Sequence, residues 1–497
     1  MTATIARGDL ISVFASADTS RQLTRRAALR VALIVFATAA VITLAMTAAP
    51  RAVAAEPVRI EGIVHNADGV PIHGARVAQG DSADVTGKDG IFTLRGGDLD
   101  LTERVHVFAS GHTERWVEVD EQGEPLEVTL ELRPIKAIYL NPLISTSDAD
   151  IDRLIALIDD TELNAIVIDI KEELVFYDTE IELFRDAGTV QPILDLSALM
   201  DKLEAHDIYS IARLVVFKDS IVAERFPDLA VRNSATGGLW RDMNGVAWVN
   251  PTDERVWEAN SDLAVEAHRH GFDEIQYDYV RFPTDGDLST LDYGVANTQA
   301  NREAAITGFL AMSSEKLWPL GAKISSDVFG YTLLVDDDLG IGQNFVELAA
   351  YVDYLSPMVY PSHFPNGSLD VAGHPNAFPY ETIEISMSLA KEKLPTRMLK
   401  VRPWLQDFTF FDLPPAYGND EVRAQIDAAE AVGTSGWMLW DPNNEFHAGA
   451  LDPDTKRSSS PPGEELARIM NRVAPSAVVA TRRARPRRSA TRSQTAD

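Results

Sequence analysis

The sequence predicts an α/β fold, a (β/α)8 TIM barrel preceded by a small all-β sandwich domain and an N-terminal signal or anchor segment. Three observations support this prediction. An uncharged apolar run follows a cluster of arginines near the N-terminus. Short runs of alternating apolar residues, typical of a sandwich, cover residues 57–133. From residue 135 onward, apolar runs alternate with helical patterns, which is the signature of βα units.

The bulk composition indicates a folded, acidic protein. The chain has 497 residues, enough for a large barrel and an accessory module. Its net charge is −30, so we expect no nucleic-acid partner, because phosphate backbones repel an acidic surface. There is no cysteine, which excludes disulfides, thiolate metal sites and a cysteine nucleophile. We find no phosphate-loop or dinucleotide fingerprint in a strand–turn–helix context, and we expect no cofactor.

Residues 1–55 predict a signal peptide or a membrane anchor. Four arginines, from Arg21 to Arg30, precede the 19 uncharged residues 31–49. Ala52-Val53-Ala54 then offers a small-residue cleavage pattern. The apolar run is long for a cleaved signal and nearly long enough to span a bilayer, so retention of residues 31–49 in the membrane is the alternative. Both readings predict an extracellular or cell-envelope location, secreted or anchored.

Residues 57–133 predict the sandwich, with turns at Asp68-Gly69 and Gly74 between period-two apolar runs. The segment resembles the carboxypeptidase regulatory-like family of transthyretin-type sandwiches. Residues 62–64, 69–77 and 86–92 carry the resemblance. It implies a non-catalytic spacer or binding module.

Residues 135–450 predict the barrel, because eight strand candidates are separated by helical stretches. Ile151, Leu154 and Ile158 have helical spacing, with Ser147 as the expected cap of that helix. The strand candidates are 136–140, 165–170, 210–216, 274–279, 323–329, 354–359, 399–404 and 436–440. The long gap after the third strand predicts an inserted hairpin or loop carrying Trp240 and Trp248 at the substrate face. The Ser-, Pro- and Arg-rich tail 454–497 is expected to be largely disordered.

Carboxylates end two neighbouring predicted strands, where barrels of this kind hold their chemistry. Asp278 ends the fourth strand and Asp327 the fifth. Glycosidic cleavage needs two such groups, an acid and a nucleophile or base. We predict Asp278 as nucleophile or base, kept ionised by Arg213 or Arg281, and Asp327 as the acid, kept protonated by apolar neighbours.

Other side chains at the predicted strand ends would hold the substrate. The polar ones would bind hydroxyl groups, and the aromatic ones would stack on sugar rings. These candidates are Asp169, Lys171, Arg213, Lys218, Tyr279, Arg281, Tyr360, His363, Arg402, Trp404, Asp407, Trp440 and Asp441. No spacing of His and carboxylate residues is diagnostic of a metal site, so none is predicted.

These motifs occur in an order that resembles one bacterial family, the glycosyl hydrolase-like domain-of-unknown-function family 4015, over residues 135–448. The segments that carry the resemblance are 165–171, 211–219, 277–283, 356–363, 402–407 and 436–441. The resemblance implies a TIM barrel related to glycoside hydrolases, without a defined substrate. One departure is the Lys171-Glu172-Glu173-Leu174 loop, where the family tends to have Asp and Gly.

Together these features predict a glycoside hydrolase that cleaves an extracellular or cell-envelope polysaccharide. Two alternatives remain: a non-catalytic carbohydrate-binding barrel, and an envelope scaffold in which the sandwich makes the contact. Hydrolysis requires Asp278 and Asp327 to lie within about 5–10 Å of each other. A short separation would predict retention of configuration, and a longer one inversion.

Overall fold

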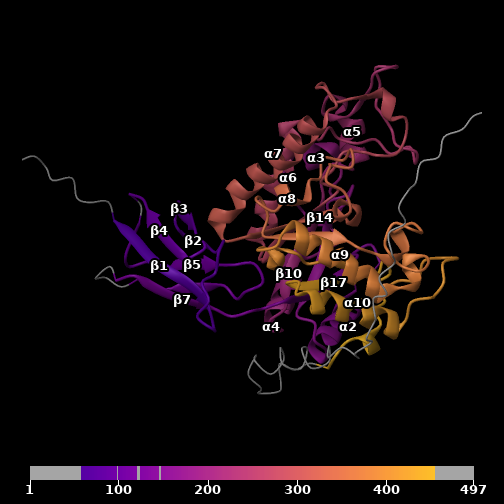
Figure 1. The fold of residues 1–497 in the computed structure, drawn as a ribbon. Helices are drawn as coiled ribbons and strands as arrows, with labels where there is room; N and C mark the ends of the chain where they lie inside the picture. Colours follow the sequence, from indigo (N-terminus) through magenta and orange to yellow (C-terminus); the bar gives the residue numbers. More distant parts are fainter. Residues whose placement is uncertain (1–57, 98, 120–123, 145–146, 454–497) are drawn as a thin grey trace, which may run out of the picture. The chain divides into compact units, whose positions relative to one another are not determined.

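The computed structural model describes residues 58–453, except 98, 120–123 and 145–146 (Figure 1). The predicted signal or anchor, including residues 31–49, and the tail 454–497 lie outside the described residues and stay predictions. Within the described part, none of the helices is both long and apolar enough to cross a membrane.

The N-terminal β region consists of two sheets. In the first, β1 (Arg59–Asn66) lies between β4 (Ile91–Arg95) and β7 (Leu126–Leu130). The second has the order β3 (Ser82–Val85), β2 (Arg76–Gln79), β5 (Val105–Phe108) and β6 (Arg115–Val117). Val64 and Phe92 of the first sheet share a buried core with Val107 of the second. The predicted all-β region is therefore confirmed, while its family resemblance stays a prediction.

Eight parallel strands close into a barrel in chain order, so the predicted (β/α)8 architecture is confirmed. The strands are β8 (Ile135–Leu140), β9 (Ala165–Lys171), β10 (Tyr209–Val215), β12 (Glu274–Asp278), β14 (Lys323–Phe329), β15 (Tyr354–Met358), β16 (Trp404–Gln406) and β17 (Gly436–Trp440). Nearly continuous apolar runs suit these strands, because both faces of each strand are buried.

Helices follow the strands and cover the outside of the barrel (Figure 1). The longer ones are α2 (Asp148–Asp160), α4 (Leu196–Ala205), α6 (Glu254–Arg269), α7 (Gln299–Leu317), α9 (Pro379–Lys393) and α10 (Asn419–Val432). Three short helices, α3 (Glu182–Ala187), α5 (Ser220–Arg225) and α8 (Phe345–Leu348), join them. The Ser147 side chain caps α2 by accepting from the Asp150 backbone N–H, and the helix buries its predicted apolar stripe.

The seventh strand begins later than predicted. We expected residues 399–404, but β16 begins at Trp404. Pro403 has no N–H to donate to a ladder, and residues 398–400 form a 3-10 turn instead. Before the proline there is an isolated bridge between Leu355 and Val401, and the continuous strand begins after it.

The predicted insertion between β10 and β12 exists, but its tryptophans are structural. β11 (Arg232–Asn233) pairs with β13 (Leu291–Asp292), and isolated bridges hold the rest of the loop. Trp240 and Trp248 are each 1% exposed. The Trp240 indole N–H donates to the Asp287 carbonyl at 2.9 Å. Their burial leaves neither ring an exposed face, although the Trp248 ring lies 6.0 Å from that of the predicted site residue Tyr279.

The β region contacts the barrel at residues where strands begin. The Arg76 guanidinium bonds the Ala322 carbonyl at 3.3 Å and lies 3.4 Å from the Asp353 carboxylate. The Gly111 N–H donates to the Tyr354 hydroxyl at 3.1 Å. Ala322 and Asp353 directly precede β14 and β15, so this contact lies at the amino ends of the strands. Between described residues, the hydrogen bonds and the ion pair named above lie on this side, and the carboxyl ends of the strands lie on the opposite side of the barrel.

Candidate active site

Arg213 occupies the centre of the site because of the alternation of β10. Ile211 faces the barrel interior, whereas Ala212 and Leu214 join the outer core between strands and helices. The period of two therefore turns Arg213 inward. Its guanidinium forms ion pairs with Asp169 and Asp278, and its Nε lies 3.7 Å from the Asp327 carboxylate.

The two predicted catalytic carboxylates are brought together by neighbouring strands. Asp278 ends β12 and Asp327 lies near the end of β14, which pairs with β12. Because one guanidinium contacts both groups, they lie within about 10 Å of each other, in the range that glycoside hydrolases use. Asp327 also accepts a hydrogen bond from the Trp404 indole N–H at 2.8 Å.

Burial raises the pKa of two acids around Arg213, Asp327 and Asp169, while the charge of the arginine opposes it. Burial, and then the charge of Asp278, raise the pKa of Asp327 well above its ordinary value, against the opposing effect of Arg213. Burial also raises the pKa of Asp169 to about 6, although Arg213 opposes this. The Tyr139 hydroxyl donates to Asp169. The centre can therefore hold a protonated acid beside a carboxylate that is paired with arginine.

Aromatic rings surround this centre. Tyr139 stacks on Trp440 with ring centroids 3.9 Å apart, and Trp404 meets the edge of Trp440 at 5.5 Å. Arg213 lies 5.2 Å from the Trp440 ring. Trp404 is buried, whereas Trp440 is partly exposed and can offer a face to a ligand.

A second group of predicted residues surrounds Tyr279. Its φ of +50° is uncommon for a residue with a side chain and marks strain at the end of β12. The Lys218 ammonium lies 4.8 Å and the Arg281 guanidinium 5.0 Å from the Tyr279 ring. Burial lowers the pKa of Arg281, whose Nε has no hydrogen-bond partner among the described residues. The two cations and the ring thus form one cluster beside Asp278.

Tyr360 and His363 follow β15. Tyr360 is buried, and burial together with the charges of Asp327 and Asp278 raises its pKa. It therefore lies beside the carboxylate pair. His363 is exposed, with its ring 5.3 Å from that of Tyr360, and burial of part of its ring lowers its pKa.

Lys171 does not point into the site, contrary to expectation. Register shifts between Asp169 and Lys171, where β9 pairs with β10, so Lys171 lies opposite the outward-facing Leu214. Its ammonium group is fully buried, lies 3.0 Å from the Asp219 carboxylate and donates to the Val215 carbonyl at 2.7 Å. The bulge thus turns this lysine into a structural ion pair.

Arg402 is also misplaced by the sequence interpretation. It precedes β16, and its fully buried guanidinium pairs with Glu274, the first residue of β12. The pair lies at the amino end of the barrel, away from Asp278. The predicted strand 399–404 placed Arg402 near its carboxyl end. The observed strand begins only at Trp404, two residues after Arg402.

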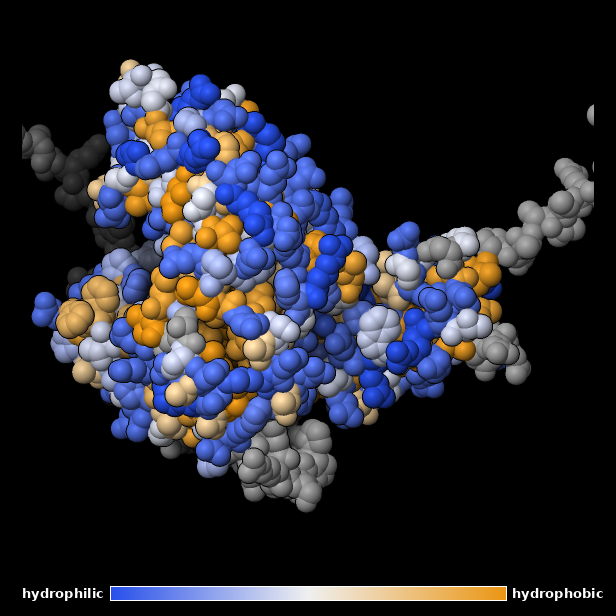
Figure 2. Space-filling model, turned by 180° about the vertical axis from the view of Figure 1, so that it is seen from behind, coloured by the Kyte–Doolittle hydropathy of each residue, from blue (hydrophilic) through white to orange (hydrophobic). Residues whose placement is uncertain are grey.

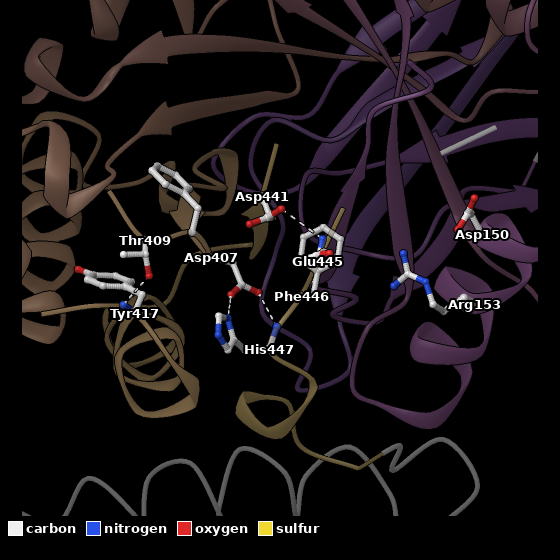
Figure 3. A pocket seen from close by; sticks show the side chains of 10 residues that line it. Asp150, Arg153, Asp407, Thr409, Tyr417, Asp441, Glu445, Phe446 and His447 are labelled. Carbon is white, nitrogen blue, oxygen red and sulfur yellow. Dashed lines mark hydrogen bonds and ion pairs between the residues drawn. The ribbon is translucent and has the colours of Figure 1, made fainter. Parts of the chain in front are cut away.

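Asp407 and Asp441 line a pocket of about 700 Å³ beside the centre (Figure 3). Asp407 is fully buried, and its carboxylate is hydrogen-bonded to the His447 ring Nδ1. Burial raises the pKa of Asp407 to about 6 and also raises that of Asp441. The pocket, rather than the carboxylate pair, is the open part of the site, since Asp278 and Asp327 side chains are 8% and 1% exposed.

Sequence reasoning missed two residues of the site, Tyr139 and His447. Tyr139 is the penultimate residue of β8, so its place at a strand end was a signal that could have identified it. His447 lies in the loop after β17, where no periodicity marks it. Over the described ranges, no group of three or more His, Asp or Glu side chains is arranged to hold a metal ion.

Comparison with known proteins identifies the barrel. Residues 137–446 match the family described as "Putative glycosyl hydrolase domain". No curated protein sequence matches the chain.

Many solved structures are similar to the chain, and the following three are among them. A hypothetical protein from Ruminiclostridium thermocellum is 32% identical, with 38% of this chain and 97% of that chain covered and a TM-score of 0.35. The PgaB (BpsB) glycoside hydrolase domain from Bordetella bronchiseptica is 12% identical, with 63% and 94% covered and a TM-score of 0.47. A class V chitinase from Pseudomonas fluorescens is also 12% identical, with 64% and 98% covered and a TM-score of 0.40.

Proposed function

This chain belongs to the glycosyl hydrolase-like domain-of-unknown-function family 4015, and from that premise we propose that it hydrolyses O-glycosidic bonds with Asp278 and Asp327. One observation carries the proposal. The carboxylates end adjacent strands and contact the same guanidinium, that of Arg213. Two carboxyl groups at this kind of separation are what glycosidic cleavage requires.

The two acids have different environments, which suits different roles. Asp278 is paired with Arg213, so it is the nucleophile or the base that activates water. Asp327 is buried with a raised pKa and is the acid that protonates the departing glycosidic oxygen. In a retaining reaction Asp327 then acts as base toward water, while in an inverting reaction Asp278 takes the proton of the attacking water.

The substrate we propose is a carbohydrate polymer outside the cytoplasm. Trp440 and Tyr279, both partly exposed beside the acids, offer aromatic faces of the kind that sugar rings stack on. The signal or anchor predicted at residues 1–55 supports an extracellular or cell-envelope location, with residues 31–49 holding the chain in the membrane if they are retained. An acidic protein is also suited to neutral rather than anionic polymers.

A non-catalytic carbohydrate-binding barrel is the second candidate. The observation that favours it is the low exposure of the pair, because a hydrolase must bring both carboxyl groups to the substrate. Hydrolysis by this chain therefore requires buried side chains beside the carboxylate pair, such as that of Tyr360, to move when a sugar binds.

Reducing-sugar release from a panel of bacterial envelope and storage polysaccharides tests the proposal. We would compare the full chain with Asp278→Asn and Asp327→Asn, and with Asp336→Asn as a matched control at a fully exposed carboxylate. We expect release from at least one polymer, lost at least about 1,000-fold in the first two variants and unchanged in the control. Binding of a polymer without any release would support the second candidate instead.

A further inference from the structure

The pocket beside the carboxylate pair has the features of a ligand site that the proposed reaction does not yet use. Its volume of about 700 Å³ is within the range of pockets that bind small molecules. Its walls are mostly polar and acidic, and aromatic rings such as Phe408 supply apolar surface between the polar groups. The lining side chains used below are Arg153, Asp407, Phe408, Asp441 and His447.

His447 is held in one orientation by a buried partner. Asp407 is fully buried and accepts from both the backbone N–H of His447, at 3.1 Å, and the ring Nδ1 (Figure 3). The Asp407 N–H in turn donates to the Trp440 carbonyl at 3.0 Å, which fixes the pair to β17. With Nδ1 engaged, Nε2 is the ring nitrogen left for a ligand, and the His447 side chain is 35% exposed.

Two strands connect the pocket to the proposed catalytic centre. Trp404 of β16 donates to Asp327, and Asp407 comes directly after that strand. Trp440 of β17 stacks beside Arg213, and Asp441 is the next residue. Phe408 lies 5.8 Å from Tyr360, ring to ring, and so connects the pocket to the residue beside the pair. A polymer chain at Asp278 and Asp327 would therefore extend into the pocket.

The charge of the pocket restricts what it can bind. Its lining includes four carboxylates, those of Asp150, Asp407, Asp441 and Glu445, and one guanidinium, that of Arg153. A uronic acid would bring a further negative charge into a partly buried site and would be repelled. Neutral sugars and amino sugars carry no negative charge, so the carboxylates do not repel them.

We propose that this pocket is a sugar-binding subsite of the same active site, in which the His447 Nε2 bonds a ring hydroxyl and Phe408 packs against a ring face of a neutral or amino sugar. This inference rests on the proposed function for its substrate class. Both residues are assigned positioning roles, so their loss should raise KM more than it lowers kcat.

Binding measurements on the full chain test the subsite. With Asp327→Asn present to prevent turnover, titration calorimetry would use cello-, N-acetylchito- and de-N-acetylated chito-oligosaccharides of two to six rings, and oligogalacturonates. We expect His447→Gln and Phe408→Ala each to weaken binding of the longer neutral or amino ligands by about tenfold. Oligogalacturonates should not bind through the subsite.

His206→Gln is the matched control, because His206 pairs with Asp159 at 2.7 Å on the surface and lines no part of the pocket. Thermal unfolding checks that each variant folds. Unchanged binding of the longer ligands in both His447→Gln and Phe408→Ala would overturn the proposal, as would binding of none of the oligosaccharides.

The reducing-sugar assay distinguishes failure of the subsite proposal from failure of the proposed hydrolysis. Cleavage that needs Asp278 and Asp327 but has the same KM in His447→Gln and Phe408→Ala at every chain length would overturn the subsite alone. Binding that depends on His447, without cleavage of any substrate, would support the subsite and contradict the hydrolase.

Discussion

At the scale of the residue, Arg213 sets the charge balance of the whole site. Its guanidinium is almost fully buried among Asp169, Asp278 and Asp327. A buried cation of this kind compensates acids that would otherwise repel one another strongly at low dielectric. The arginine thus has a structural task beside the one proposed in catalysis.

Replacing this arginine should destabilise the protein as well as inactivate it. Arg213→Met leaves buried carboxylates without their partner, and we expect a loss of about 3–5 kcal/mol in the free energy of unfolding. Urea denaturation measures it. Arg255→Met removes a comparable but exposed pair with Asp228, and should cost less than about 1 kcal/mol. Equal losses in the two variants would contradict the compensating role of Arg213.

The Trp404 indole should tune the pH dependence of the reaction. Its hydrogen bond to Asp327 favours the charged carboxylate and so lowers the pKa of that acid, against the effect of burial. Trp404→Phe removes the bond, so Asp327 should stay protonated to higher pH. The alkaline limb of kcat/KM should move upward, by up to about one pH unit.

Trp437→Phe is the control for this shift, since Trp437 is equally buried but donates to Glu430. An alkaline limb that moves downward in Trp404→Phe, or moves equally in both variants, would show that Asp327 is not the acid.

At the scale of the element, the barrel closes where β17 meets β8, and this contact depends on Gly436. Its φ is +109°, and a Cβ there would lie 2.0 Å from the Ile135 carbonyl oxygen. Glycine is the residue that tolerates both the conformation and the close approach. The first residue of β17 thus fixes the register of the last strand pair.

Two alanine substitutions distinguish the energetic cost of a positive φ from the cost of a steric clash with the Ile135 backbone. Gly433→Ala, at φ +91° with open space around the Cβ, should cost about 1 kcal/mol of unfolding free energy. Gly436→Ala, with the same strain plus the clash, should cost about 3 kcal/mol or more. Similar costs, measured by chemical denaturation, would mean that the contact between β17 and β8 relaxes freely.

At the scale of the whole molecule, the N-terminal β region and the site lie at opposite ends of the barrel strands. Arg76 and Gly111 contact residues at the amino ends, whereas Asp278 ends its strand. Hydrophilic residues cover most of the surface in Figure 2, and apolar ones gather in its middle. Among its described residues, Arg76 and Gly111 of the β region therefore contact the barrel at the end away from the site.

Weakening this contact should change stability and leave kinetics alone. Arg76→Met removes the bond to Ala322 and the ion pair with Asp353, and we expect about 1–3 kcal/mol lower unfolding free energy. KM and kcat on any cleaved polymer should equal those of the unmodified chain. A raised KM would contradict the separation and favour a substrate-binding role for the β region.

The sequence predicted the barrel well because its strands are buried on both faces and read as apolar runs. β14 and β17 begin and end where expected. The errors have local causes that only the three-dimensional register reveals. Because β16 begins after Pro403, Arg402 lies at the amino end of the barrel and not near the site. The bulge in β9 directs the Lys171 side chain outward. His447 lies in a loop, and only folding brings it to Asp407.

The most direct test of the central claim compares two kinds of substrate in Asp278→Ala and Asp327→Ala. A natural glycosidic bond needs an acid, whereas an aryl glycoside with an activated dinitrophenolate leaving group does not. On the sugar that the full chain releases, we predict that both variants lose polymer cleavage and that only Asp327→Ala keeps cleaving the aryl glycoside. Retention of polymer cleavage by either variant would contradict the account, and loss of both activities in both variants would contradict the role of Asp327 as acid.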